Sequence, residues 1–522
     1  MADRHGDLEK TGYCSDSSPV RNAKAQEGSV STHKDGFFSA FKPHSFKRNH
    51  NARMVTEVTD LEGRPLADQP PAEPALAMKL KERHLQMIAI GGSIGTGLFV
   101  GSGSALAAGG PASLIIAYGL IGVMLFCTVH ALGELAVAFP IAGAFSVYSS
   151  RFIDPAWGFA MGWNYALNWL VTLPLELVAA SITVSYWPGA KDINPAAFVI
   201  IFYIVIIAIN FFGVEGFGEA EFVFSIIKVV AVVGFVILGI IIAAGGFYMV
   251  SLTVVGCIVP YNDPALLNGS SHQDANASPF VIAVKNAGIS VVPSIMNVVI
   301  LIAVLSVGNS AVYGSSRTMA ALADRGQAPK ILGYIDNTGR PLVAIILASV
   351  VGLLCLIVAA GTETRVQAFN WLLAISGLSS IFTWGSICAC HIRFRHAWKY
   401  NGRTLDELAF TSQPGYYGSW LGLIMNLLIL AAQFWTAIWP VGYGVLSKSE
   451  VIKGFFEAYL ALPIVIVFFI GFKIIKKTKF KRIQDIDITS GMRELDLPAI
   501  LAEERAIMAT WPWYKKVWNT IF

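Results

Sequence analysis

Long apolar stretches separated by short polar segments make up this chain from about residue 79 to residue 473. A helix needs about 20 apolar residues to cross the hydrocarbon core of a bilayer. Stretches of roughly this length or longer cover residues 85–108, 112–138, 157–187, 196–212, 222–259, 287–312, 342–360, 368–390, 419–440 and 454–473. Only helices and closed barrels satisfy every backbone group inside lipid. The pattern therefore predicts an all-α polytopic membrane domain with about ten net crossings.

The first apolar stretch, residues 85–108, is interrupted by glycines and small hydroxyl residues. Its centre reads Gly91-Gly92-Ser93-Ile94-Gly95-Thr96-Gly97. Glycine costs roughly 1 kcal/mol relative to alanine inside a helix, so this density predicts a span that opens midway. Free amides and the N-terminus of a half-helix at such an opening can hold a carboxylate. The alternative is close helix packing, because Gly-x-x-x-Gly spacing also occurs here.

The stretch over residues 222–259 is anomalous in length. Its 38 residues would measure roughly 57 Å as one helix, against about 30 Å of hydrocarbon. It is too long for one span and slightly too short for two. We expect a helix to about Ala243, a bend near Gly245-Gly246 and a half-buried remnant over Phe247–Val259. Together these make one net crossing.

Basic residues orient the chain in the membrane. Lys79, Lys81 and Arg83 flank the first apolar stretch on its N-terminal side, so the positive-inside rule predicts a cytoplasmic N-terminus. If 222–259 crosses once, all the basic segments that follow the first stretch fall on the cytoplasmic side. These segments contain Arg151; Arg317, Arg325, Lys330 and Arg340; Arg393, Arg395, Lys399 and Arg403; and Lys473–Arg482. Both termini are therefore predicted to be cytoplasmic.

Two polar tails and one large loop flank the spans. Residues 1–78 lack apolar periodicity, which predicts a disordered cytoplasmic tail accessible to regulatory proteins. Residues 474–522 form a second cytoplasmic tail, in which Leu495–Ala509 has the pattern of an amphipathic helix. Loop 260–286 is expected outside, where Asn268-Gly-Ser is either a glycosylation site or an unmodified sequon.

Composition supports a membrane protein and excludes several other classes. Hydrophobic residues make up 55% and charged residues 14% of the chain, against about 25% charged in soluble domains. A net charge of +4 is too small to indicate nucleic-acid binding. The six cysteines are scattered without metal or disulfide spacing. Neither a nucleophile elbow nor a P-loop occurs, so we expect no enzyme activity, cofactor or metal.

A carboxylate inside the third apolar stretch is the first candidate for chemistry. Asn168, Thr172, Glu176 and Thr183 fall on one face of a helix. A carboxylate is costly in lipid and should face the protein interior. Glu176 is therefore a candidate for proton coupling or for meeting a substrate ammonium. The alternative is a structural hydrogen bond between helices.

Lys228 is the second candidate, inside stretch 222–259. Its long stem could snorkel to the lipid headgroups. Alternatively, Lys228 is a buried lysine that gains and loses a proton during a transport cycle. The sequence does not decide between the two.

Other polar residues in the spans could serve either helix packing or function. Ser306, Asn309 and Ser310 either line a path or bond to the preceding turn of their own helix. The cluster from Ser376 to Ser380 suits a pocket as well as close packing. Glu134 is expected to be solvated or interfacial, and His391 is expected to be interfacial.

Several of these motifs resemble the fungal amino-acid permeases of the amino acid–polyamine–organocation superfamily, and in particular its general amino-acid permease branch. The matching segments are residues 81–99, Leu173-Pro-Leu-Glu-Leu177, Tyr261-Asn-Asp-Pro264, Arg317 to Lys330, Cys388-Ala-Cys-His-Ile-Arg-Phe-Arg395 and Glu503-Glu-Arg-Ala-Ile-Met-Ala509. The resemblance implies a LeuT-type fold of two inverted five-helix repeats. It also implies proton-driven uptake of amino acids across the plasma membrane.

The same resemblance assigns roles to particular residues. Ser93, Ile94, Gly95, Thr96 and Gly97 would hold the substrate carboxylate on the opened first helix. Glu176 and Lys228 would take part in proton coupling, the lysine standing where sodium sits in sodium-driven relatives. Ser376 would touch the substrate side chain.

One element of the family pattern is missing. Residues 222–244 resemble the fifth helix and 247–261 the end of the seventh, so the sixth helix, also broken at the substrate site, is absent. We therefore expect an incomplete fold and weak or no uptake by this exact chain. One alternative is a sensor that binds amino acids without transporting them. Another is a misassigned exon boundary in a gene that encodes a complete permease.

Overall fold

The computed structural model describes residues 43–49, 80–95, 97–190, 192–240, 278–286, 291–360, 362–440, 443–444, 446–492 and 511–512. Within these ranges the secondary structure is helical, apart from one isolated β-bridge between Arg48 and Asp336. The expected all-α class is thus confirmed. The predicted bend at Gly245-Gly246, the remnant 247–259, Asn268 and the helix Leu495–Ala509 lie outside the described residues.

Thirteen α-helices are described. They are α1 (Glu82–Ser93), α2 (Ser102–Ala138), α3 (Ala144–Phe152), α4 (Pro155–Val184), α5 (Pro195–Phe211), α6 (Gly213–Ile240), α9 (Pro279–Asn286), α10 (Val292–Asp324), α11 (Leu342–Gly352), α12 (Thr362–Tyr400), α13 (Gly415–Ile438), α14 (Lys448–Tyr459) and α15 (Ala461–Lys476). Shorter 3-10 turns cover Pro43–Phe46, Pro188–Ala190, Lys330–Gly333, Leu353–Ala360, Leu405–Glu407 and Ile483–Asp485, and a π-turn, η3, covers Gly97–Gly101.

The apolar stretches correspond to these helices, but several helices are longer than the stretches. Six described helical segments are long and apolar enough to span a bilayer, and a seventh results if α14 and α15, bent by 63°, form one span. Helix α6 begins at Gly213 rather than near residue 222, and α10 continues to Asp324, beyond the expected end at residue 312. The polar ends of both helices therefore extend past the apolar windows.

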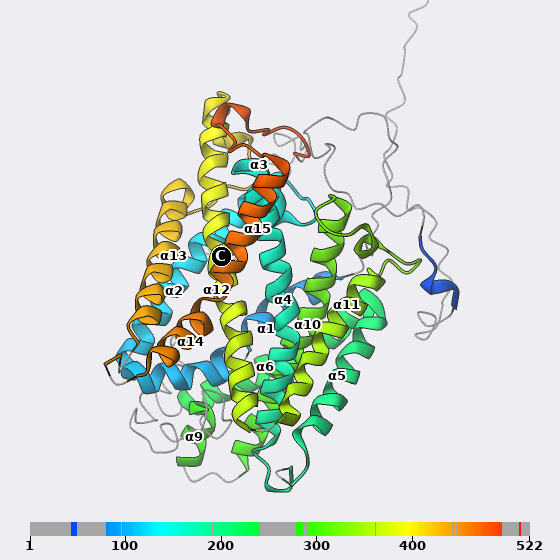
Figure 1. The fold of residues 1–522 in the computed structure, drawn as a ribbon, viewed down its shortest axis with the longest axis vertical. Coiled ribbons are helices and arrows are strands. Elements are labelled where there is room, and N and C mark those ends of the chain that lie inside the picture. Colours follow the sequence, from blue (N-terminus) through cyan, green and yellow to red (C-terminus); the bar gives the residue numbers. More distant parts are fainter. Residues whose placement is uncertain are drawn as a thin grey trace, which may run out of the picture.

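The helices pack side by side in one bundle, with α4 at its centre (Figure 1). Asp154 caps α4 by accepting a hydrogen bond from the amide of Ala156, and Pro155 occupies the first turn, where no amide partner is needed. Of the six spanning segments, α4 is the most deeply buried. Two glycines, Gly158 and Gly162, allow α3 and α10 to approach it closely.

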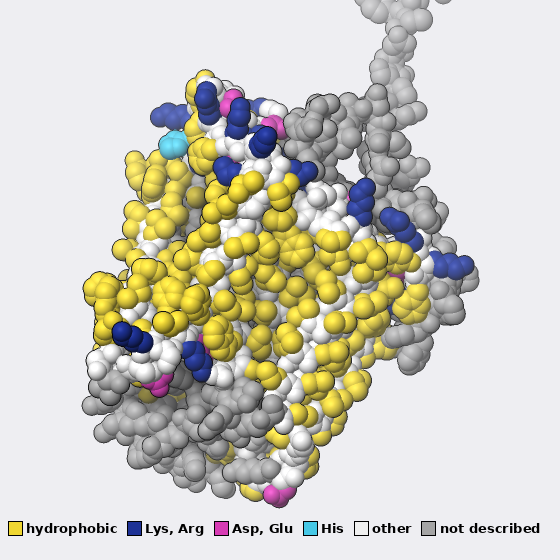
Figure 2. Space-filling view, in the orientation of Figure 1, with side chains coloured by type: hydrophobic (Ala, Val, Ile, Leu, Met, Phe, Trp, Pro, Cys, Tyr) yellow, Lys and Arg dark blue, Asp and Glu magenta, His cyan; other side chains and the backbone are white. Residues whose placement is uncertain are grey.

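The surface shows how the bundle sits in a membrane. A broad band of hydrophobic side chains crosses the middle of the molecule, and Lys and Arg side chains gather at the end that carries α3 (Figure 2). Large apolar residues such as Ile116, Leu120 and Val123 on α2 point outward and are about half exposed. Such a surface requires lipid around it, so the protein is a multi-pass membrane protein.

A short piece of the N-terminal tail, residues 43–49, is among the described residues. Pro43–Phe46 forms a 3-10 turn. The amide of Asn49 then donates to the carbonyl of Ile335 at 3.0 Å, and the Tyr334 hydroxyl donates to the carbonyl of Phe46 at 2.8 Å. This segment is thereby joined to the loop between α10 and α11.

Candidate functional site

The first span opens where its glycines cluster. Helix α1 ends at Ser93, Ile94 has an extended backbone, and helical structure resumes in η3 at Gly97. The amides of Leu98 and Phe99 both bond to the carbonyl of Gly95. The expected break is therefore present, although Thr96 and the side chain of Ser93 lie outside the described residues. Gly110, with φ of 74°, then turns the chain into the rest of α2.

Lys228 lies directly beside this break. Its side chain is fully buried. The Nζ atom donates one hydrogen bond to the carbonyl oxygen of Gly91 at 2.5 Å and another to Ser306 Oγ at 2.9 Å. The snorkelling interpretation is therefore wrong, because the ammonium reaches a helix break and not the headgroups.

Glu221 is a buried carboxylate that the sequence reasoning missed. It is 1% exposed, and its two oxygens accept hydrogen bonds from Ser306 Oγ at 2.6 Å and from Asn309 Nδ2 at 2.8 Å. Asn309 Oδ1 in turn accepts from Asn210 Nδ2 on α5 at 2.8 Å. Glu221 directly precedes the apolar window that begins at residue 222. Its position seven residues before Lys228, on the same helix face, is the signal that could have found it.

Glu176 faces the protein interior, as expected of a carboxylate in a span. It is 4% exposed, and its β-carbon lies close to Gly308 of α10. It is near enough to Lys228 for the two charges to interact. Glu176, Lys228 and the start of the helix break are thus brought together in one region of the bundle.

Ser376 on α12 faces the polar side of α4. Its hydroxyl donates to Asn168 Oδ1 at 2.7 Å and lies 3.3 Å from Thr172 Oγ1. Thr172 is one turn from Glu176, so Ser376 lies on the Glu176 side of α4. Among the described contacts none joins Ser376 to residues 93–97.

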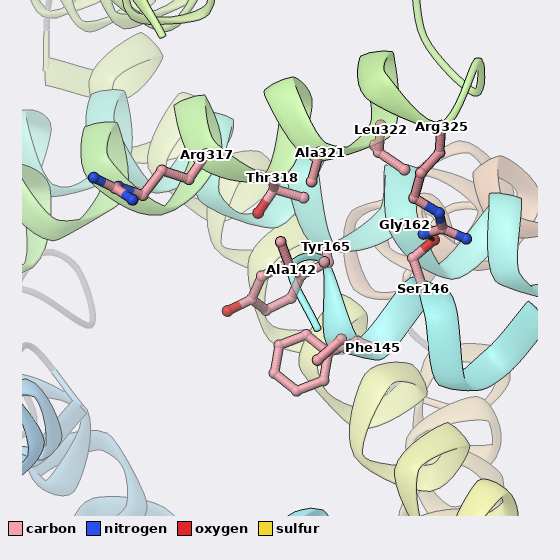
Figure 3. Close-up of a pocket in the computed structure, with 12 residues that line it drawn as sticks. Ala142, Phe145, Ser146, Gly162, Tyr165, Arg317, Thr318, Ala321, Leu322 and Arg325 are labelled. Carbon is pink, nitrogen blue, oxygen red and sulfur yellow. Dashed lines mark hydrogen bonds between the residues drawn. The ribbon is translucent and has the colours of Figure 1, made fainter. Parts of the chain in front are cut away.

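A cavity of about 260 Å³ lies between α3, α4 and α10, on the basic side of the bundle (Figure 3). Arg325 points into the region between α3 and α10 and donates to Ser146 Oγ at 2.9 Å, while Arg317 extends away from it. The residues that line the cavity are Ala142, Gly143, Ala144, Phe145, Ser146, Gly162, Tyr165, Arg317, Thr318, Ala321, Leu322 and Arg325. None of the expected substrate residues is among them.

Glu134 and His391 are buried, contrary to the solvated or interfacial roles expected from the sequence. Both are fully inaccessible to solvent. One Glu134 oxygen lies 2.6 Å from Arg395 Nε and 3.0 Å from His391 Nε2, and the other accepts from the amide of Ser412 at 2.7 Å. These partners come from α12 and the loop before α13, so the carboxylate joins distant parts of the chain.

Comparison with known proteins identifies the family of this chain. The profile described as amino acid permease matches residues 84–246 and 240–485. General amino-acid permease GAP2 of Candida albicans is 53% identical, over 86% of this chain and 87% of that protein. The chain belongs to the amino acid permease family.

Other permeases of this family are also similar. General amino-acid permease GAP1 of Saccharomyces cerevisiae is 48% identical, and the match covers 86% of each chain.

Among solved structures, a manganese transporter of Eremococcus coleocola aligns with a TM-score of 0.44 and 13% identity, over 81% of this chain and 98% of that one. Membership of a permease family makes this protein a membrane transporter by descent and not an enzyme.

Proposed function

We propose that this protein is a proton-coupled amino-acid permease of the plasma membrane, with both termini in the cytoplasm and a substrate site at the break of its first span. The observation that carries the proposal is the hydrogen bond from Lys228 Nζ to the carbonyl of Gly91. It links a titratable cation to the backbone that opens for the substrate.

The break and its neighbouring residues provide groups that can bind the carboxylate, the ammonium and the side chain of an amino acid. Its non-helical backbone at Ile94 and the half-helix that begins at Gly97 favour a carboxylate, because the N-terminus of a helix carries partial positive charge. Glu176 supplies negative charge nearby for protons or for a substrate ammonium. Ser376, whose hydroxyl bonds to Asn168 and lies beside Thr172, would contact the substrate side chain.

Lys228 links proton binding to the shape of the first span. The ammonium has three donors, and two of them hold Gly91 and Ser306. Loss of its proton removes the charge that strengthens the bond to the Gly91 carbonyl, since charge-assisted hydrogen bonds are roughly twice as strong as neutral ones. Deprotonation of Lys228 would therefore release the cytoplasmic half of the span.

We further propose that the sixth helix of the family is absent and that this chain transports poorly. Two observations support this. The family profile matches in two pieces that meet at residues 240–246. The match to GAP2 extends over 523 positions but includes only 86% of the 522 residues here, so GAP2 contains positions without a counterpart in this chain.

Uptake of radiolabelled amino acids by cells that lack their own permeases tests both parts of the proposal. We expect uptake at least about tenfold below that of GAP2 at equal surface expression, the factor that a loss of about 1.4 kcal/mol in binding gives. Insertion of the corresponding GAP2 segment after Ala244 should restore uptake, and that uptake should fall when an uncoupler removes the proton gradient.

The control for the restored chain is the same insertion with Lys228→Met, which should lose the proton dependence. Uptake by the unaltered chain at the GAP2 level would contradict the missing-helix proposal. Restored uptake that ignores the proton gradient would contradict proton coupling. Sequencing the transcript across Ala244–Phe247 distinguishes a true deletion from a misassigned exon boundary.

A further inference from the structure

The network around Lys228 contains a second titratable group, Glu221, on the same helix. The two residues are seven positions apart, which places them on one face of α6, two turns from each other. Both are at most 1% exposed. An isolated charge in such a place is costly, whereas an opposite charge nearby offsets the cost.

Ser306 of α10 connects the two groups. A serine hydroxyl has one proton to donate and can accept through its lone pairs. Here it donates to Glu221 Oε2 at 2.6 Å and accepts from Lys228 Nζ at 2.9 Å. Asn309 Nδ2 occupies the other Glu221 oxygen at 2.8 Å, so both oxygens act as acceptors, as in an ionised carboxylate. The arrangement is an ammonium and a carboxylate joined by one hydroxyl.

We propose that Glu221 is the proton-exchange partner of Lys228, with the hydroxyl of Ser306 as the relay between them. This inference rests on the proton-coupled function proposed above. In the exchange, an N–H bond of Lys228 breaks as its proton passes to Ser306 Oγ. At the same time the original hydroxyl proton of Ser306 passes to Glu221 Oε2, which breaks the original O–H bond. The products are a neutral amine, a neutral carboxylic acid and an intact serine, so no net charge enters the bundle.

The exchange explains how a buried lysine can lose its charge without leaving an uncompensated carboxylate. Ionised together or neutral together, the pair adds no net charge to the interior. Only the ionised pair holds Gly91 through a charge-assisted bond. Glu221 thereby controls whether the start of the helix break is fixed.

Other titratable groups near the pair come from three helices. Glu176 of α4 interacts electrostatically with Lys228. Closer to the basic end, Glu219 of α6 contacts Arg83 at 2.5 Å and His84 at 3.2 Å, both from α1. Described residues of α10 bring Ser306, Asn309 and Ser310 to the pair, and Asn210 of α5 bonds to Asn309; none of these four titrates. Glu176 is therefore the competing proton acceptor, and Glu219 is the matched control.

Infrared spectroscopy of the purified full-length protein in lipid nanodiscs tests the proposal, because a protonated carboxyl group has its own carbonyl band. In Lys228→Met, Glu221 loses its counter-charge and should take a proton, so a protonated-carboxyl band is expected at neutral pH. Adding Glu221→Gln should remove that band, whereas adding Glu219→Gln should leave it. If Glu176→Gln removes the band and Glu221→Gln does not, Glu176 is the partner and the proposal fails.

Thermal unfolding at several pH values provides a second measurement that keeps Lys228 in place. Glu221→Gln leaves the buried lysine without its counter-charge, so this variant should gain stability as pH rises from about 6 to 9, more steeply than the parent chain. Glu219→Gln should follow the parent. An unchanged slope in Glu221→Gln would overturn the proposal.

Ser306→Ala tests the relay. Without the hydroxyl, the two groups are coupled only by their direct electrostatic interaction, and the effect of Glu221→Gln on the slope should shrink in the Ser306→Ala background. A full effect in that background would show that Ser306 is not the link. Neither measurement uses transport, so both decide this inference even if uptake proves independent of the proton gradient.

Discussion

Glu134 illustrates how a single buried residue joins parts of the chain that are far apart in sequence. Its carboxylate belongs to α2, whereas Arg395 and His391 belong to α12 and Ser412 to the following loop. Arg395 is only 9% exposed. Removing the carboxylate would leave that guanidinium buried without its charge partner.

We predict that Glu134→Ala lowers the free energy of unfolding by about 3–5 kcal/mol, the usual cost of removing one partner of a buried ion pair. Thermal unfolding of the purified protein, followed by intrinsic fluorescence, measures the change. Asp406→Ala provides a control, because this exposed carboxylate lies in the loop after α12. Equal and small effects of the two substitutions would refute the prediction.

Helix packing depends on one glycine at the start of the first break. A β-carbon at Gly91 would overlap the side chain of Ser225 on α6, whereas one at the neighbouring Gly92 would meet nothing within 4 Å. Gly91 also supplies the carbonyl that Lys228 holds. The distance between α1 and α6 is therefore set by the absence of a side chain at this position.

Gly91→Ala should destabilise the protein by about 1–3 kcal/mol, because overpacking forces the two helices apart. Gly92→Ala should be neutral or stabilising, since alanine favours a helix by up to about 1 kcal/mol over glycine. Melting temperatures of the two variants, measured in the same detergent, test the contrast. The prediction fails if Gly92→Ala is the more damaging of the two.

The sequence predicts the elements better than their ends or their partners. Apolar length reveals the spans, and the glycine cluster reveals the break at Ile94, because both are local properties. The continuation of α10 through Arg317 to Asp324 is not visible in hydropathy, since polar residues there still form helix. Ser306 and Glu221 are 85 positions apart, so no local pattern could indicate that they meet.

At the scale of the whole molecule, the basic end is closed by contacts between early and late segments. Asp154, which caps α4, accepts hydrogen bonds from Lys473 and from Thr478 Oγ1. Burial raises the pKa of Asp154, but Lys473, Thr478 and the amide of Ala156 lower it more strongly and hold it below its ordinary value. Arg151 adds a bond at 2.9 Å to the carbonyl of Ser490.

A lowered pKa in the folded state means that ionised Asp154 stabilises the fold above the unfolded pKa of about 3.9 and that this contribution is lost as pH falls through the folded value. We predict a loss of thermal stability below about pH 4 that Asp154→Asn reduces. Asparagine also caps helices, so the substitution removes the charge and keeps the cap. Identical pH profiles for parent and variant would exclude this contribution.

These long-range contacts also fix an order of events during synthesis. Lys473 and Ser490 follow their partners Asp154 and Arg151 by more than 300 residues. At a synthesis rate of about 5–20 residues per second, roughly 15 s or more pass between the synthesis of Asp154 and Arg151 and that of Lys473 and Ser490. Until then, α3 and the start of α4 have none of these contacts. The contacts that close the basic end around Asp154 and Arg151 therefore form last, after all the described spans have been made.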